Sequence, residues 1–171
     1  QVKDINSAGS SSSNPSNLTA AGGTLYFVAN DGTDGSELWS SDGTSSGTVQ
    51  VKNIASGSNG SWPNHLTIVG STLYFNANGS QGQELWKSDG TDSGTVIVKD
   101  IYSGSESSTP YDLRVDGSTL YFIAKAATTG MELWKSDGTE SGTAIVKDVN
   151  TGTDHSNPAR FVTIGNTVYF I

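Results

Sequence analysis

The chain repeats itself at intervals of 47 or 48 residues, and this period limits its possible folds more than any other feature of the sequence. The triplet Glu-Leu-Trp begins at Glu37, Glu84 and Glu132, and all four prolines fall on the same period. Two further motifs repeat in register with it: Thr-(Leu/Val)-Tyr-Phe from Thr24, Thr72, Thr119 and Thr167, and Ser-Asp-Gly-Thr from Ser41, Ser88 and Ser136. Several different motifs that recur with one period indicate a row of similar structural units.

Each unit is predicted to contain four short β-strands. The first strand ends at a Gly-containing pair of residues that suits a hairpin turn. The second is apolar at nearly every position, as in a strand covered on both faces. The third contains Glu-Leu-Trp and leads into the Ser-Asp-Gly-Thr turn. The predicted first strands are Leu18–Ala21, Leu66–Val69, Leu113–Asp116 and Phe161–Ile164, and the predicted fourth strands are Val2–Ile5, Val51–Ile54, Val98–Ile101 and Val146–Val149.

Four antiparallel strands in 47 or 48 residues match the size of a β-propeller blade. A sheet that is apolar on both faces must stack on neighbouring sheets, and radial stacking achieves this. We therefore predict an all-β fold in which residues 1–171 form a single repeat domain, or a fragment of one, as a β-propeller segment. The predicted blades span residues 18–54, 66–101 and 113–149, while residues 161–171 supply the first two strands of an incomplete blade and residues 1–5 supply its fourth strand.

The incomplete blade lacks its Glu-Leu-Trp strand. Either the chain is a segment of a longer repeat array, which we favour, or another chain supplies the missing strand. In both cases we expect a third strand to lie against Thr167–Ile171, because proteins normally cover an exposed apolar edge. The isolated segment is accordingly expected to self-associate through this edge.

Composition argues against two classes of partner. The formal net charge is −8, whereas a nucleic-acid binder needs a positive field, and so does a protein that binds an anionic membrane surface. No apolar run approaches the roughly 18 residues that a membrane span requires. Cysteine is absent, which excludes disulfides and thiolate metal sites.

The blocks Glu-Leu-Trp-x-Ser-Asp-Gly-Thr-x-Ser-Gly-Thr resemble the ELWxxDGT repeat of large, mostly secreted or surface bacterial proteins, and the resemblance extends from Val2 to Ile171. It implies a propeller-like protein located outside the cytoplasm, with no shared catalytic activity. The turn also resembles the Asp-box of sialidase-type propellers. That resemblance implies that Asp42, Asp89 and Asp137 form turns.

Two sets of repeated side chains are candidates for chemistry. Glu37, Glu84 and Glu132 have the carboxylates that a glycosidase needs, but they are copies of one position. We interpret them as structural residues, either exposed or paired within a turn. The repeated tryptophans are expected to pack between blades, and an aromatic platform for sugar rings is the alternative. They are Trp39, Trp86 and Trp134.

No cofactor is expected, and Ca²⁺ is the one ion worth weighing. Asp31 and Asp34 lie in a Gly-rich loop between a second and a third strand, where clustered oxygen ligands suit Ca²⁺. The spacing differs from that of an EF-hand, and the equivalent loops lack the carboxylates. A solvated turn is therefore the preferred interpretation.

Variation among the copies is more informative than the repeated residues. The connections after the second and fourth strands differ between units, and in an up-and-down blade both sets lie on one rim. Variable loops on a constant frame are typical of binding surfaces, and drift in unconstrained loops is the alternative. The ligand-binding candidates on this rim are Trp62, His65, Tyr102, Tyr111, His155 and Arg160.

These observations predict a non-catalytic, extracellular scaffold for adhesion or for surface or matrix structure, with a protein or carbohydrate partner at the cell surface. Two functions of other classes stay open. One is a polysaccharide-acting enzyme, which would need carboxylates present in one repeat and absent from the others. The other is a self-assembling filament or ring in which chains complete one another's blades.

Overall fold

The computed structural model describes residues 1–7, 11–159, 162–164 and 167–171, and every regular element in this part is a β-strand. Three four-stranded sheets are antiparallel meanders, with each strand paired to the next along the chain. The first sheet contains β1 (Ser16–Ala21), β2 (Thr24–Asn30), β3 (Ser36–Ser41) and β4 (Val49–Lys52). The second contains β5 (Asn64–Val69), β6 (Thr72–Gly79), β7 (Gly82–Ser88) and β8 (Val96–Lys99), and the third contains β9 (Tyr111–Asp116), β10 (Thr119–Ala126), β11 (Thr129–Ser136) and β12 (Ala144–Lys147).

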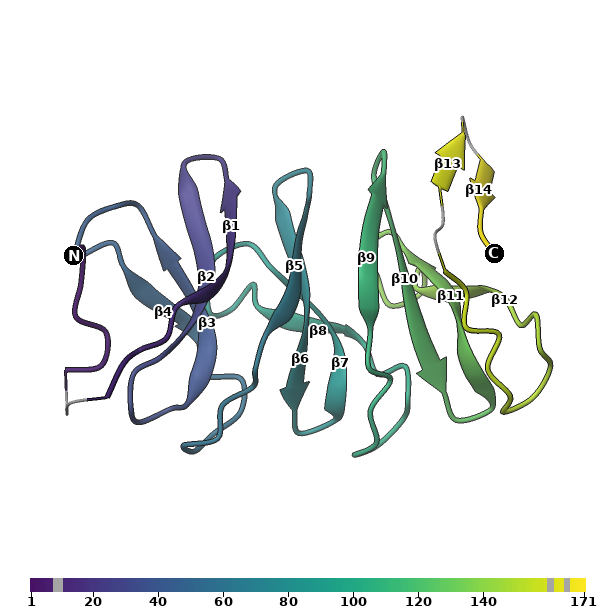
Figure 1. Cartoon of the computed structure of the whole chain (residues 1–171), viewed down its shortest axis with the longest axis horizontal. Helices are drawn as coiled ribbons and strands as arrows, with labels where there is room; N and C mark the ends of the chain where they lie inside the picture. The colour runs from purple at the N-terminus through teal and green to yellow at the C-terminus, as the bar shows by residue number, and fades with distance from the viewer. Residues whose placement is uncertain (8–10, 160–161, 165–166) are drawn as a thin grey trace.

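The three sheets stand side by side in a row, with the chain termini at opposite ends (Figure 1). The first strands form one edge of the row, since β1 contacts β5 and β5 contacts β9. The connections between second and third strands and those that lead from one sheet to the next lie together at the lower edge of Figure 1. The variable loops therefore share one rim. Within the described residues no helix is long and apolar enough to cross a membrane.

The hydrophobic core lies between the sheets. One face of the first sheet packs against the opposite face of the second, and the second packs in the same way against the third. The first interface contains Tyr26, Leu38, Val51, Leu73, Phe75 and Ala77, and the second contains Tyr74, Leu85, Val98, Leu113, Leu120, Phe122 and Trp134. Each middle strand is thus buried on both faces, which accounts for its nearly continuous apolar sequence.

The fourth strands are displaced from their predicted positions. They end at Lys52, Lys99 and Lys147, two residues earlier than the sequence pattern predicts. The reason is visible at Ile54, whose backbone N–H donates to a carboxylate oxygen of Glu37 at 3.2 Å and so is not available for strand pairing. Ile101 and Val149 donate to the equivalent glutamates.

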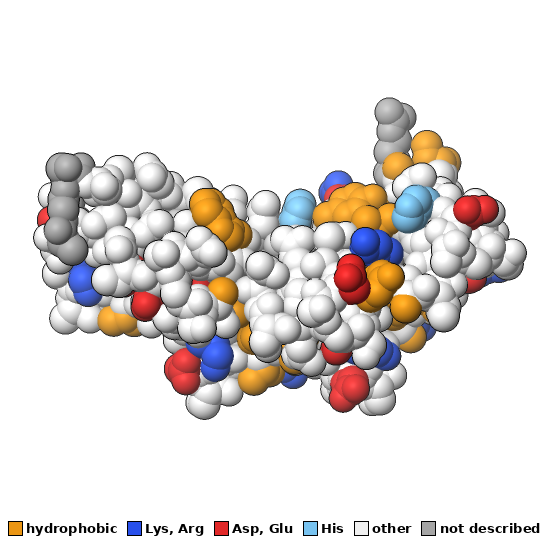
Figure 2. All heavy atoms as spheres, turned by 90° about the horizontal axis from the view of Figure 1, so that it is seen from below, with side chains coloured by type: hydrophobic (Ala, Val, Ile, Leu, Met, Phe, Trp, Pro, Cys, Tyr) orange, Lys and Arg blue, Asp and Glu red, His pale blue; other side chains and the backbone are white. Residues whose placement is uncertain are grey.

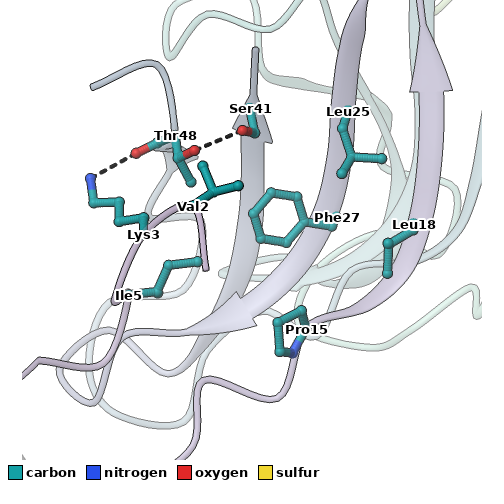
Figure 3. Close-up of a pocket in the computed structure, with 9 residues that line it drawn as sticks. All are labelled: Val2, Lys3, Ile5, Pro15, Leu18, Leu25, Phe27, Ser41 and Thr48. Carbon is teal, nitrogen blue, oxygen red and sulfur yellow. Dashed lines mark hydrogen bonds between the residues drawn. The ribbon is translucent and has the colours of Figure 1, made fainter. Parts of the chain in front are cut away.

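The prediction of a fourth strand at Val2–Ile5 is wrong, since the structure assigns no strand there. A fourth strand pairs with a third strand, and the described residues before residue 36 contain none. The segment nevertheless packs as a fourth strand would: Ile5 contacts the cluster of Phe27 and Trp39, and Lys3 Nζ donates to the Thr48 carbonyl at 2.7 Å. A groove of about 200 Å³ lies between this segment and the first sheet (Figure 3).

The last two strands, β13 (Val162–Ile164) and β14 (Thr167–Tyr169), form an antiparallel hairpin. Reciprocal backbone hydrogen bonds between Ala159 and Ile171 extend it. The predicted start of this first strand, Phe161, lies outside the described residues. The hairpin exposes large hydrophobic side chains to solvent, namely Val162, Ile164, Tyr169 and Ile171.

Candidate functional site

The glutamates of the three Glu-Leu-Trp motifs are fully buried, so of the two structural alternatives, an exposed or a turn-paired residue, the exposed one is wrong. Glu84 accepts hydrogen bonds from the backbone N–H groups of Ile101, Tyr102 and Ser108 at 3.0–3.3 Å, and from the Ser108 hydroxyl at 2.5 Å. Burial raises the pKa of Glu84 above its ordinary value, and these hydrogen bonds oppose part of that shift. The carboxylate holds the loop that leads from one sheet to the next.

The other two glutamates do the same, and their serine partners were not identified from the sequence. Glu37 accepts hydrogen bonds from the amide and hydroxyl of Ser61, and Glu132 accepts them from the amide and hydroxyl of Ser156. Each serine lies 24 residues after its glutamate, within a repeated Ser-x-Pro. The constant position of these serines, two residues before the repeated prolines, is the sequence signal that identifies them.

The Asp residues of the Ser-Asp-Gly-Thr motifs lie in exposed turns. Asp89 Oδ1 accepts hydrogen bonds from the Thr91 hydroxyl at 2.7 Å and from the Thr91 amide at 2.9 Å, and these bonds lower the pKa of Asp89. A Cβ on Gly94 would overlap the same carboxylate, which explains the second glycine of the longer block Ser-Asp-Gly-Thr-x-Ser-Gly-Thr. Asp42 and Asp137 make the equivalent bonds.

The repeated tryptophans pack within the row of sheets. Trp39 and Trp134 are only 6% and 7% exposed, and Trp86 is partly buried against the first interface. They do not form an aromatic platform on the surface.

Asp31 is engaged by its own turn. Its carboxylate accepts hydrogen bonds from the Thr33 amide and hydroxyl and from the Asp34 amide at 2.7–2.8 Å. Partial burial acts to raise the pKa of Asp31, but these bonds outweigh it and the pKa is lowered. Among the described residues, no group of three or more His, Asp or Glu side chains is placed to hold a metal ion.

The rim with the variable loops is shown in Figure 2. Hydrophobic side chains form separate patches there, on a face that is otherwise mostly neutral. Trp62 lies on this rim and is 61% exposed. His65 lies at the surface of β5, where partial desolvation lowers its pKa and the carboxylate of Asp112 on β9 opposes that shift. Tyr111, the neighbour of Asp112, begins β9, so the contact between β5 and β9 brings His65 and Tyr111 of the predicted set together.

The remaining rim candidates lie in other groups. The Lys125 ammonium lies 5.4 Å from the centre of the Tyr102 ring, a cation–π contact between the end of β10 and the connection that follows β8. His155 Nδ1 accepts a hydrogen bond from the Met131 amide at 2.7 Å, which fixes the loop after β12. Arg160 lies outside the described residues.

A pocket of about 380 Å³ lies on the rim beside Trp62, between the first and second sheets. Three separate segments of the chain form it: the entry to β1, the end of β2 with the start of β3, and the entry to β5. No charged side chain lines it, and the four asparagines among its residues were not predicted as site residues. The lining residues are Asn14, Ser16, Asn17, Val28, Asn30, Ser36, Trp62, Pro63 and Asn64.

Comparison with known proteins establishes the fold and no more. No family model matches the chain, and no curated protein matches it. Among solved structures, puromycin hydrolase complexed with PGG superposes with a TM-score of 0.56 at 16% identity, over 91% of this chain and 24% of that one. The chain is a β-propeller segment.

A second solved structure in the comparison is an α-L-arabinofuranosidase from Clostridium thermocellum, with a TM-score of 0.39 at 14% identity over 94% of this chain and 60% of that one. The segment thus spans about a quarter of the hydrolase and three fifths of the arabinofuranosidase.

Proposed function

We propose that the chain is part of a non-catalytic, extracellular β-propeller scaffold that binds a ligand through the variable loops of one rim. One observation supports this above all: the repeated glutamates are engaged within the fold, whereas Trp62 and His65, which differ from their copies, are exposed at the surface. Glu84 is enclosed by four hydrogen-bond donors, whereas Trp62 is exposed on the rim.

The anchoring of the rim loops supports the same function. Because Glu37 and Glu84 fix Ser61 and Ser108 to the sheets, the residue after each serine has a defined position. That residue is Trp62 in one loop and Thr109 in the next. A rigid backbone with interchangeable side chains limits the entropy lost on binding, which favours recognition.

The resemblance to ELWxxDGT repeats leads us to place this scaffold outside a bacterial cell, in adhesion or in surface or matrix structure. Its partner would then be a protein or a carbohydrate of the cell surface. A net charge of −8 is consistent with partners other than nucleic acid.

A loop exchange tests the proposal. Trp62→Thr, Asn64→Tyr and His65→Asp together give the β5 entry the sequence of the β9 entry. On an array of bacterial surface polysaccharides and surface proteins, we expect the native chain to bind at least one member and the exchanged chain to lose that binding.

The matched control lies on the opposite rim, where Gly23→Ser gives the first hairpin turn the sequence Gly-Ser of the second. This variant should bind like the native chain. Binding that survives the rim exchange, or a native chain that binds no member of the array, would contradict the proposal.

A further inference from the structure

The backbone at Trp62 has a conformation that disfavours tryptophan. Its φ is +53°, in the left-handed region, and Pro63 follows it. The equivalent residues Asn14, Thr109 and Asn157 have φ between +44° and +49°. Asparagine tolerates this region, while a bulky side chain there is a clear outlier, and a following proline restricts the residue further. Two of the four copies have asparagine, so tryptophan is an unfavourable residue for this turn, as is the β-branched Thr109.

Packing does not compensate for this strain. The indole of Trp62 is 61% exposed, so most of its apolar surface stays in water. Its backbone is nevertheless held firmly: the Trp62 amide donates to the Ser36 carbonyl at 3.0 Å, and Ser61 before it is bound to Glu37. A strained residue that a surrounding structure holds in place is a signature of functional sites.

The pocket beside the indole is lined by neutral hydrogen-bonding groups. Asn17 Nδ2 donates to the Pro63 carbonyl at 3.1 Å, which joins the first and second sheets at this point. Asn30 and Asn64 each accept a backbone hydrogen bond through Oδ1, at 2.7 and 2.8 Å. In the described part of the chain these bonds leave the NH₂ donors of both asparagines available to a ligand.

We propose that this pocket binds a neutral carbohydrate, with Trp62 stacked on the C–H face of a sugar ring and the asparagine amides bonded to its hydroxyls. This inference rests on the proposed rim function and names its ligand class. The lining has no charge to pair with a phosphate, carboxylate or amine, while a flat aromatic face beside amides matches a polyhydroxylated ring. A volume of about 380 Å³ falls within the usual range for small-molecule sites, about 300–1,000 Å³.

The decisive variant is Trp62→Asn, which installs the residue that the turn prefers. If Trp62 is retained for binding, this variant should have an unchanged or higher melting temperature and at least tenfold weaker affinity. The matched control is Thr109→Asn, the same change at the equivalent position of the next loop. It should not alter sugar binding.

The probes are neutral cello-, xylo-, arabino- and manno-oligosaccharides, with oligogalacturonate as the anionic comparison. Binding is followed by tryptophan fluorescence, to which the exposed Trp62 responds most, and by saturation-transfer NMR. The expected result is Trp62-dependent binding of at least one neutral oligosaccharide in preference to oligogalacturonate.

Three results would overturn the inference: a melting temperature that falls in Trp62→Asn, equal sugar binding by Trp62→Asn, or no binding of any neutral oligosaccharide. Loss of a protein ligand in the rim loop exchange, without any sugar binding, would leave the proposed function standing and remove this inference alone. The absence of rim-dependent binding to any class of ligand would remove both.

Discussion

Glu37, Glu84 and Glu132 show how one buried side chain can hold a long connection. At each position a carboxylate gathers backbone amides and a hydroxyl from the loop that follows the fourth strand. Buried donors without an acceptor are costly, so the loop and the glutamate depend on each other.

Replacing Glu84 should therefore destabilise the whole segment. Glu84→Gln keeps the shape but replaces one acceptor oxygen with a donor group, which leaves a buried donor unsatisfied. We expect a loss of about 1–3 kcal/mol in the free energy of unfolding, measured by urea denaturation. Glu106→Gln changes an exposed glutamate of the same loop and should have almost no effect. Equal losses in both variants would contradict this role for Glu84.

The hydrogen bonds of the turn aspartates lead us to expect that the stability of the chain depends on pH. Hydrogen bonds from the Thr91 hydroxyl and amide lower the pKa of Asp89 below its ordinary value of 3.8. Its contribution to stability is therefore present above pH 3.8 and is lost as the pH falls through the lower pKa of the folded state. Asp89→Asn keeps an acceptor but cannot ionise. Its melting temperature should lie below that of the native chain at pH 6, and the two should converge once the pH falls below the lowered pKa of Asp89. A gap that is independent of pH would refute the assignment.

At the residue scale, the sequence predicted what repeats or varies locally. Trp62 was identified because it differs from its copies, and Asp89 because its turn has a recognisable sequence. The role of Glu84 was missed because its partner, Ser108, lies 24 residues away in a loop without hydrophobic periodicity. The asparagines around Trp62 were missed because three separate segments form the pocket, and a linear pattern cannot show that juxtaposition.

The structural elements meet through contacts that recur from sheet to sheet. Tyr26 of β2 lies against Gly90 in the turn of the second sheet, and Tyr74 of β6 lies against Gly138 in the turn of the third. Burial raises the pKa of Tyr74, with a further effect from the nearby charge of Asp137. The Ser-Asp-Gly-Thr turn therefore belongs to the interface between blades as well as to its own sheet.

Gly43 and Gly138 lie in equivalent turns, and comparing them distinguishes the role of the turn in its own sheet from its role in the interface between blades. Gly43 and Gly138 have φ of +89° and +88°, but a Cβ on Gly138 would overlap the Tyr74 hydroxyl, whereas a Cβ on Gly43 would contact nothing within 4 Å. Both alanine variants should lose about 1–2 kcal/mol because of the positive φ. Gly138→Ala should lose about 1–3 kcal/mol more because of the overlap.

Tyr74→Phe supplies the second half of this test. It should recover part of the extra loss in Gly138→Ala and none of the loss in Gly43→Ala, as measured by thermal unfolding of each double variant. Equal losses for the two glycines would show that the turn does not support the neighbouring blade.

The number, order and pairing of strands in the three complete sheets followed from the repeat and from the apolar second strands. The fourth strands were displaced by two residues because amides such as that of Ile54 bond to a glutamate side chain, which competes with strand pairing. The strand at Val2–Ile5 was not found because a strand exists only beside a partner, and sequence similarity alone does not provide one.

For the whole molecule, the outer face of the third sheet resembles an interface without its partner. Val146 and Val149 are 40% and 52% exposed, while their equivalents in the second sheet, Val98 and Ile101, are 5% and 7% exposed. The hairpin β13–β14 beyond it exposes further apolar side chains. A two-stranded hairpin of this kind is only marginally stable alone, so we expect both features to pack against another blade of the same type.

The segment of residues 1–171 should therefore associate as its concentration rises. Light scattering and sedimentation should show dimers or larger species for the native segment, and Val146→Ser with Val149→Ser should weaken the association. Extending the chain by one Glu-Leu-Trp strand should cover Thr167–Ile171 and reduce it as well. A native segment that stays monomeric at high concentration, with both ends ordered, would disprove the open-blade interpretation.

The lysines at the ends of the fourth strands each link their own sheet to the next one along the chain. Lys52 donates to the Asp92 carbonyl of the next sheet at 3.0 Å, and Lys99 to the Thr143 carbonyl at 2.9 Å. Every peptide unit has a carbonyl, so the backbone part of this link does not depend on the receiving side chain, although Lys52 also pairs with the Asp92 carboxylate at 3.5 Å. A gene segment that duplicates one such unit would encode a blade already matched to both neighbours. Proteins of this design can therefore lengthen by recombination, without compensating mutations at each new junction.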